Sequence, residues 1–150
     1  MAEERDPIPG AGLVNLTFVG TGLLVVSSIA GAAAPDRFGL AHAVVSCILF
    51  TVGTGGLLWA YALGVSRSRV DAVSLPGLFF LAGDAAPAEV RRPFRVALAV
   101  EVVVVVAAAL IRPYTEVAFG VLAPMYAMGL MGAWGGRYGR FPLRAAKGMS

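Results

Sequence analysis

Apolar residues are gathered into four long runs that contain few charged residues, separated by short polar or proline-containing segments. The runs cover residues 13–34, 43–65, 94–111 and 117–134. An α-helix needs about 20 apolar residues to cross the hydrocarbon core of a bilayer, with a tolerance of roughly 17 to 25. Backbone amides cannot stay unpaired in lipid, so each run is predicted to be helical. The pattern predicts an all-α membrane protein with one transmembrane domain over residues 1–150, its four spans forming an up-down bundle.

The segments between the runs differ in character. Residues 70–82, between the second and third runs, are too short to cross a bilayer and too apolar for water, which predicts an interfacial segment. Residues 135–150 form a basic tail. Within the fourth run, Pro124 has no N–H to donate to the carbonyl of Gly120, so we expect a kink there.

The composition supports this interpretation. Hydrophobic residues make up 58% of the chain and charged residues 14%, about half of the usual charged share of a soluble domain. The net charge of +3 does not indicate nucleic-acid binding, because the basic residues lie between apolar runs and not on one patch. Ten Lys and Arg residues fall in the N-terminus, the middle loop and the tail, and two in the short connections. The positive-inside rule then predicts a multi-pass membrane protein with both termini in the cytoplasm.

Candidate chemistry is sparse. Cys47 and His42 are the only residues of their kinds, so we expect no disulfide, no metal site and no cofactor. His42 directly precedes the second run, at the outer end of the predicted helix, where we expect it to be solvated. No arrangement of nucleophile and base is evident, so we expect no enzyme.

Small residues repeat along one face of three of the runs. Helices in lipid associate through close packing of such residues. The expected helix-packing residues are Gly20, Ser27 and Gly31 in the first run, Gly53, Ala60 and Gly64 in the second, and Gly129, Gly132 and Gly136 in the fourth run and just after it. Packing within the bundle is the simplest use of these faces; docking of a membrane-protein partner or of a second copy is the alternative.

Glu101 is the one carboxylate inside an apolar run. A charged acid at mid-depth costs about 2.5 kcal/mol or more, so we expect Glu101 to be protonated and hydrogen-bonded. The candidate neighbours at a similar depth are Thr21, Thr54, Tyr61 and Tyr126. Either Glu101 is a structural carboxyl bonded to these hydroxyls, or it is a proton-coupling or cation-binding group.

Several segments of the second half resemble small integral membrane proteins of actinobacteria that have no assigned activity. They are residues 75–81 (LPGLFFL), 112–115 (RPYT), 119–126 (FGVLAPMY), 132–135 (GAWG) and 141–142 (FP). The resemblance implies a bacterial plasma membrane and brings no substrate or known small molecule. The favoured function is an accessory or structural membrane component that acts through its helix faces and a basic cytoplasmic surface. The alternative is a small, proton- or cation-coupled transporter that uses Glu101 and works as a monomer or dimer.

Overall fold

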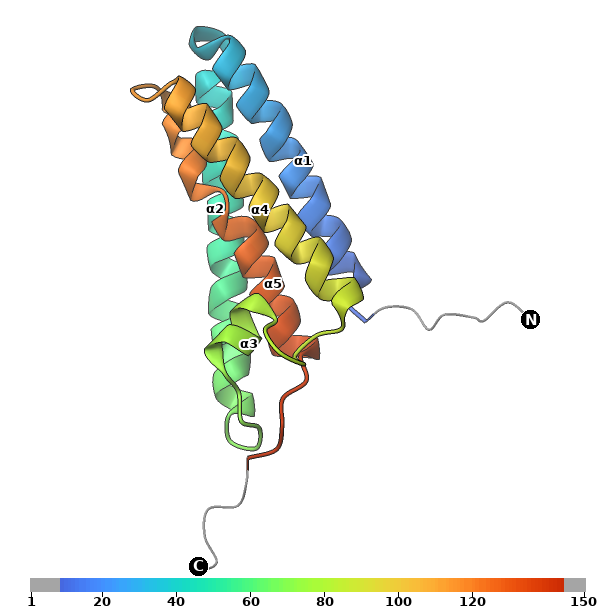
Figure 1. The fold of residues 1–150 in the computed structure, drawn as a ribbon. Coiled ribbons are helices and arrows are strands. Elements are labelled where there is room, and N and C mark those ends of the chain that lie inside the picture. Colours follow the sequence, from blue (N-terminus) through green and yellow to red (C-terminus); the bar gives the residue numbers. More distant parts are fainter. Residues whose placement is uncertain (1–8, 145–150) are drawn as a thin grey trace, which may run out of the picture.

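The computed structural model describes residues 9–144, and within them the chain is helical with no strand (Figure 1). The elements in chain order are α1 (Ala11–Ala33), α2 (Pro35–Arg67), α3 (Leu75–Phe80), α4 (Ala88–Ile111), the 3₁₀ helix η1 (Glu116–Leu122) and α5 (Met125–Tyr138). Four stretches are long and apolar enough to cross a membrane. They are α1, α2, α4 and the stretch Glu116–Tyr138, which contains both η1 and α5. The predicted all-α, four-span membrane fold is confirmed.

The helices start earlier than the apolar runs on which the prediction rested. α2 begins at Pro35, eight residues before the second run, and Pro35 occupies its first turn, where a missing N–H costs nothing. α4 begins at Ala88 and includes the arginines that precede the third run. Charged residues end an apolar run without ending a helix, because helical hydrogen bonding depends on the backbone.

The fourth span is interrupted, which is a stronger effect than the expected kink. Pro124 cannot donate to the carbonyl of Gly120, and the N–H of Ala123 donates to that carbonyl instead at 2.9 Å. This closes a tighter, 3₁₀-type turn. The chain turns at Ala123 and Pro124, and α5 starts afresh at Met125. The fourth span therefore consists of two half-helices.

This interrupted span lies at the centre of the bundle. In the most apolar stretch of this span 56% is buried, against 22–28% in the corresponding stretches of the other three spans. η1 and α5 pack against α1, α2 and α4, and α1 packs against both α2 and α4. The core is accordingly rich in side chains of α5, including Leu130, Met131 and Trp134. Trp134 is 1% exposed, and its indole N–H donates to the carbonyl of Pro9 at 2.8 Å.

Residues 70–82 fold back against the bundle. Ser74 caps α3 by accepting a hydrogen bond from the N–H of Gly77 at 3.1 Å. Leu78 and Leu81 are buried, and Phe79 lies against Gly132 of α5. Phe80 is 46% exposed.

The predicted basic tail starts as helix, since α5 continues to Tyr138. Beyond it the chain pairs with the middle loop: the N–H of Arg140 donates to Ala85 and that of Arg144 to Val70, each at 2.9 Å. Residues 145–150 lie outside the described part of the chain.

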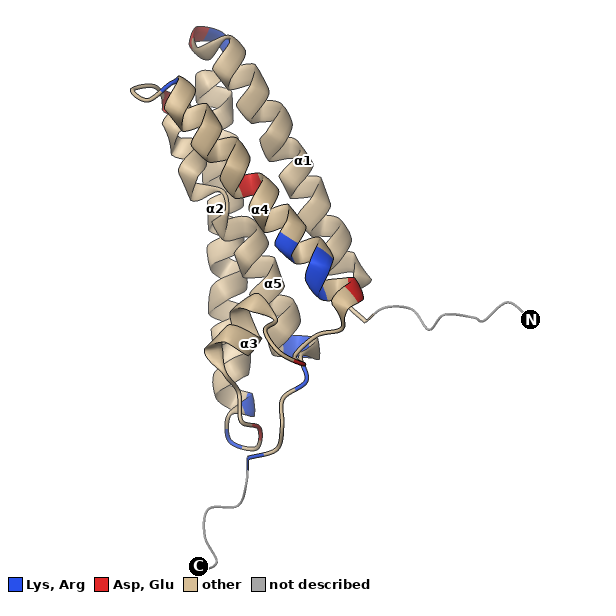
Figure 2. Cartoon of the chain, viewed as in Figure 1, with Lys and Arg blue, Asp and Glu red and all other residues tan. Residues whose placement is uncertain are grey.

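Charged residues gather at the two ends of the bundle (Figure 2). The hairpin end contains the turns between α1 and α2 and between α4 and η1, and its charged residues are Asp36, Arg37, Arg112 and Glu116. The opposite end, here called the Arg-rich end, contains the middle loop and the end of α5. Its arginines are Arg67, Arg69, Arg91, Arg92, Arg95, Arg137, Arg140 and Arg144.

Candidate functional site

Glu101 lies on the face of α4 that is turned into the bundle. This face repeats at helical spacing through Phe94, Ala97, Glu101, Val105 and Ala108, all of which are buried. The exposed fraction of Glu101 itself is 0%. A fully enclosed carboxyl needs hydrogen-bond partners, because a buried polar group left unpaired costs free energy.

Two other spans provide those partners. The hydroxyl of Thr21 on α1 lies 2.7 Å from Oε1 of Glu101, and the backbone N–H of Ala127 on α5 donates to Oε2 at 3.3 Å. Oε2 is therefore an acceptor. The bond to Thr21 can run in either direction, so a neutral acid would carry its proton on Oε1 and donate it to the hydroxyl. One side chain thus joins α1, α4 and α5.

The break in the fourth span explains the bond from Ala127. The first amides of any helix have no partner within it, and Ala127 is the third residue of α5. Pro124, the residue before α5, has no side chain that could cap the helix. Glu101 reaches over from α4 and accepts from one of these free amides. The N-terminus of a helix also carries partial positive charge, which favours a carboxyl at this place.

Tyr126 lies beside this site but bonds elsewhere. Its hydroxyl donates to the carbonyl of Leu16 at 2.6 Å, and its ring lies against Gly20. Of the four candidate neighbours, the structure thus bonds Thr21 to Glu101 and places Tyr126 next to it. Thr54 is half-buried with no hydrogen-bond partner among the described residues, and Tyr61 is 59% exposed on the outer surface of α2.

A second buried polar group was missed by the sequence analysis. His42 is 0% exposed, and its Nδ1 lies 3.1 Å from the hydroxyl of Ser27. We had expected a solvated histidine, and this is wrong because α2 begins at Pro35 and places His42 in its third turn. Gly31 and Gly120 leave room for the imidazole ring. Pro35 was the signal in the sequence that could have shown this.

The expected packing residues all lie at contacts between elements. Gly20 contacts Tyr126, Gly31 contacts His42 and Val117, and Ser27 reaches His42. Gly53 and Gly129 face each other, and their backbones touch where α2 crosses α5. Ala60, Gly64, Gly132 and Gly136 complete the packing of α2 and α3 against each other and against α5.

The described residues offer little for other chemistry. Residues 9–144 contain no group of three or more His, Cys, Asp and Glu side chains placed to hold a metal ion. The one ion pair found there, between Arg67 and Asp71 at 3.2 Å, belongs to the Arg-rich end, where Arg67 also donates to the carbonyls of Gly136 and Gly139. The site that remains is the enclosed carboxyl of Glu101.

Comparisons with protein-family models, with curated proteins and with solved structures gave no match to this chain. The functional argument therefore rests on the residues and the geometry described above.

Proposed function

We propose that this chain is an accessory or structural component of a membrane, in which Glu101 holds the spans together and moves no proton or ion. The observation that carries this proposal is the enclosure of Glu101, which is 0% exposed with both of its oxygens engaged by neighbouring spans. A coupling carboxyl has to exchange its proton or ion with water on both sides of the membrane. An enclosed carboxyl with fixed partners is suited to holding helices in place.

The hollows of the bundle support the same proposal. The groove between α2 and η1 and the smaller one between α1 and α4 are lined almost wholly by apolar side chains, and Glu101 lines neither. Both grooves are on the outer surface, which in a four-span protein faces lipid or another protein. Helix surfaces are therefore the main means by which this chain would act on its surroundings.

The proposal includes an orientation. The Arg-rich end would face the cytoplasm of a bacterial cell, because loops rich in arginine are retained there. In this orientation the arginines at this end, including Arg69, Arg137 and Arg140, would lie near the membrane surface and would suit anionic lipid or an acidic partner.

Reporter fusions test this orientation. An alkaline phosphatase fused after Arg92 or Ser150 should be inactive, and one inserted after Pro35 or Pro113 should be active, since that enzyme needs an oxidising periplasm. An active fusion after Arg92 would contradict the assignment.

A second candidate function is proton- or cation-coupled transport through Glu101. The observation that favours it is the interrupted fourth span, because broken helices with free N-termini form the substrate sites of many transporters. Buried polar groups add to this: His42 is enclosed nearer the hairpin end, and the hydroxyls of Ser28 and Ser46 have no hydrogen-bond partner among residues 9–144.

Proton flux in proteoliposomes separates the two functions. The purified chain would be reconstituted with a pH-sensitive dye inside the vesicles, and a membrane potential would be applied with potassium and valinomycin. We expect the same flux in wild type, in Glu101→Gln and in protein-free vesicles. A flux that is present in wild type and lost in Glu101→Gln would contradict the accessory function and establish Glu101 as the coupling group.

A further inference from the structure

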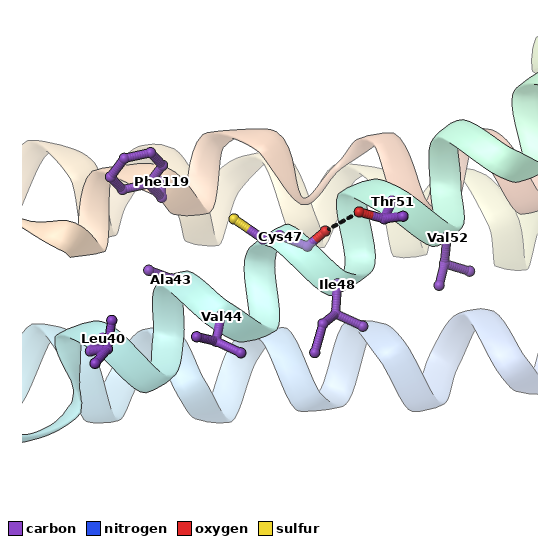
Figure 3. Close-up of a pocket in the computed structure, with 8 residues that line it drawn as sticks. All are labelled: Leu40, Ala43, Val44, Cys47, Ile48, Thr51, Val52 and Phe119. Carbon is purple, nitrogen blue, oxygen red and sulfur yellow. Dashed lines mark hydrogen bonds between the residues drawn. The ribbon is translucent and has the colours of Figure 1, made fainter.

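The start of α4 offers a specific polar contact that the hollows of the bundle surface do not. The groove beside α2 is lined by apolar side chains together with Cys47 and Thr51, and the hydroxyl of Thr51 donates to the carbonyl of Cys47 at 2.8 Å (Figure 3). No charged group lines this groove, so nothing in it would select one lipid from another. The start of α4, in contrast, carries three arginines within five residues, Arg91, Arg92 and Arg95.

Two of these arginines are held in place by the segment around α3. A guanidinium N–H of Arg91 donates to the carbonyl of Gly83 at 2.7 Å, and one of Arg95 donates to the carbonyl of Phe80 at 3.1 Å. Phe80 is the last residue of α3, and the last carbonyls of a helix have no partner within it. The middle loop thus fixes both guanidinium groups beside α4, so less conformational freedom is lost when they bind a further group.

Most donors of these two side chains remain free. A guanidinium group has several N–H donors, and each of the two forms only one hydrogen bond within residues 9–144. The one ion pair in that part of the chain joins Arg67 and Asp71. The acidic residues nearby, Asp84 and Glu89, are exposed and form no ion pair with either guanidinium group. The free donors therefore have no carboxylate partner in the described chain.

An apolar strip continues from the two arginines along the same side of α4. At 100° per residue, Arg95 is turned about 40° from Arg91, and Val102 and Val106 fall within about 20° of Arg95. Both valines are exposed, at 43% and 46%. At about 1.5 Å per residue they lie roughly 10–17 Å further along the span, a distance similar to the hydrocarbon thickness of one leaflet.

This combination matches a phospholipid with a net negative charge. Its phosphate can accept from both guanidinium groups, which are one helical turn apart, and guanidinium is suited to paired contacts with phosphate. Its acyl chains can then lie against Val102 and Val106. An acidic soluble protein could offer the charge, but it has no apolar part that would reach along a span. A zwitterionic lipid would bring a further cation to a place that already has three arginines.

We propose that Arg91 and Arg95 form a binding site for one anionic phospholipid, with the phosphate held between the two guanidinium groups and the acyl chains along α4. Arg92 adds positive charge beside this site. The proposal rests on the proposed function, in which the Arg-rich end lies at a membrane surface, and it adds the class of lipid and the residues that bind it.

Native mass spectrometry of the detergent-purified chain tests the site. The protein would be mixed with equal amounts of phosphatidylglycerol and phosphatidylcholine that have the same acyl chains, and the lipids that stay bound would be counted. Wild type should prefer phosphatidylglycerol by about tenfold or more, since each arginine near an anionic headgroup contributes roughly fivefold. Arg91→Gln with Arg95→Gln should lower this preference to about twofold or less.

Arg69→Gln with Arg137→Gln is the matched control. It removes the same charge from the same end, and both side chains are exposed and form no hydrogen bond among the described residues. The control should keep the preference of wild type within about twofold, because its arginines are not fixed beside an apolar strip. An equal loss of preference in the control would overturn the proposal, since net charge and not a site would then bind the lipid.

Two measurements on wild type do not depend on the folding of a variant. Phosphatidylglycerol with a photoactivatable acyl chain should label Val102 and Val106 more strongly than the matched phosphatidylcholine does. Inorganic phosphate at the concentration of the lipid should not displace it, because phosphate has no chains to lie along α4. Equal retention or equal labelling by the two lipids would overturn the proposal, and displacement by inorganic phosphate would reduce the site to one for a free anion.

The acidic N-terminal segment is the competing occupant within the chain, since it contains Glu3, Glu4 and Asp6. Glu3→Gln, Glu4→Gln and Asp6→Asn together should leave the retention of phosphatidylglycerol unchanged. Stronger retention in this variant would overturn the proposal and assign the two arginines to that segment. None of these outcomes reads the role of Glu101, so proton flux tests the accessory function separately.

Discussion

Gly53→Leu is expected to destabilise the bundle by about 3 kcal/mol or more, at or above the upper end of the cost of overpacking. A side chain at this position would collide with the backbone of Met125 and Tyr126, at the start of α5. Backbone cannot turn aside as a flexible side chain can, so α2 and α5 would have to separate. The collision also falls next to the chain break on which the Glu101 site depends.

The measurement is the free energy of unfolding in a mild detergent, obtained by titration with dodecyl sulfate and followed by circular dichroism. Gly22→Leu is the matched control, since Gly22 is exposed on α1 and an added side chain there would meet no atom within 4 Å. That control should stay within about 0.5 kcal/mol of wild type. Equal losses in the two variants would mean that α2 and α5 do not cross at Gly53.

Glu101→Met is the second substitution with a large expected effect. Methionine has a similar length but leaves the hydroxyl of Thr21 and the N–H of Ala127 without their partner in the interior. Each buried group left unpaired costs about 1–3 kcal/mol, so we expect a loss of roughly 3 kcal/mol. Glu101→Gln should lose less than about 1 kcal/mol, because its amide can accept from Ala127 and donate to Thr21.

The same unfolding titration measures both variants, with Val103→Met on the lipid-facing side of α4 as the control for a new methionine. Stability of Glu101→Met equal to that of wild type would show that the carboxyl holds nothing together. The informative quantity is the difference in the free energy of unfolding between Glu101→Gln and Glu101→Met. Both substitutions remove the titratable proton, but only glutamine keeps the hydrogen bonds.

The sequence predicts the spans and their packing faces because both follow from local rules. Apolar length determines which segments can cross a bilayer, and the spacing of small residues determines which faces approach closely. Gly20, Gly53 and Gly129 accordingly lie at helix contacts. Depth made Thr21 a candidate partner of Glu101, because both residues are near the middle of spans that run in the same direction, and the structure bonds the two side chains.

The remaining features depend on how the spans are arranged around one another. Thr54 and Tyr61 were also candidate neighbours of Glu101, because their positions along the spans give them a similar depth. Tyr61 is on the outer surface of the bundle. The bond from Ala127 requires the fourth span to break and to occupy the centre of the bundle. Proline predicts the place of such a break but not the group that will bond the freed amide. His42 was misplaced for a local reason, the start of α2 at Pro35.

The central claim is that Glu101 is an enclosed carboxyl that joins three spans. Infrared spectroscopy of the chain in lipid tests it most directly, with the carboxyl C=O band of Glu101 assigned by its loss in Glu101→Gln. Because the exposed fraction of Glu101 is 0%, the band should shift only slowly after transfer to D₂O and should stay constant when the pH of the bulk solution is changed. A band that shifts at once in D₂O, and gives way to a carboxylate band as the bulk pH rises, would contradict the claim, because water would then reach Glu101.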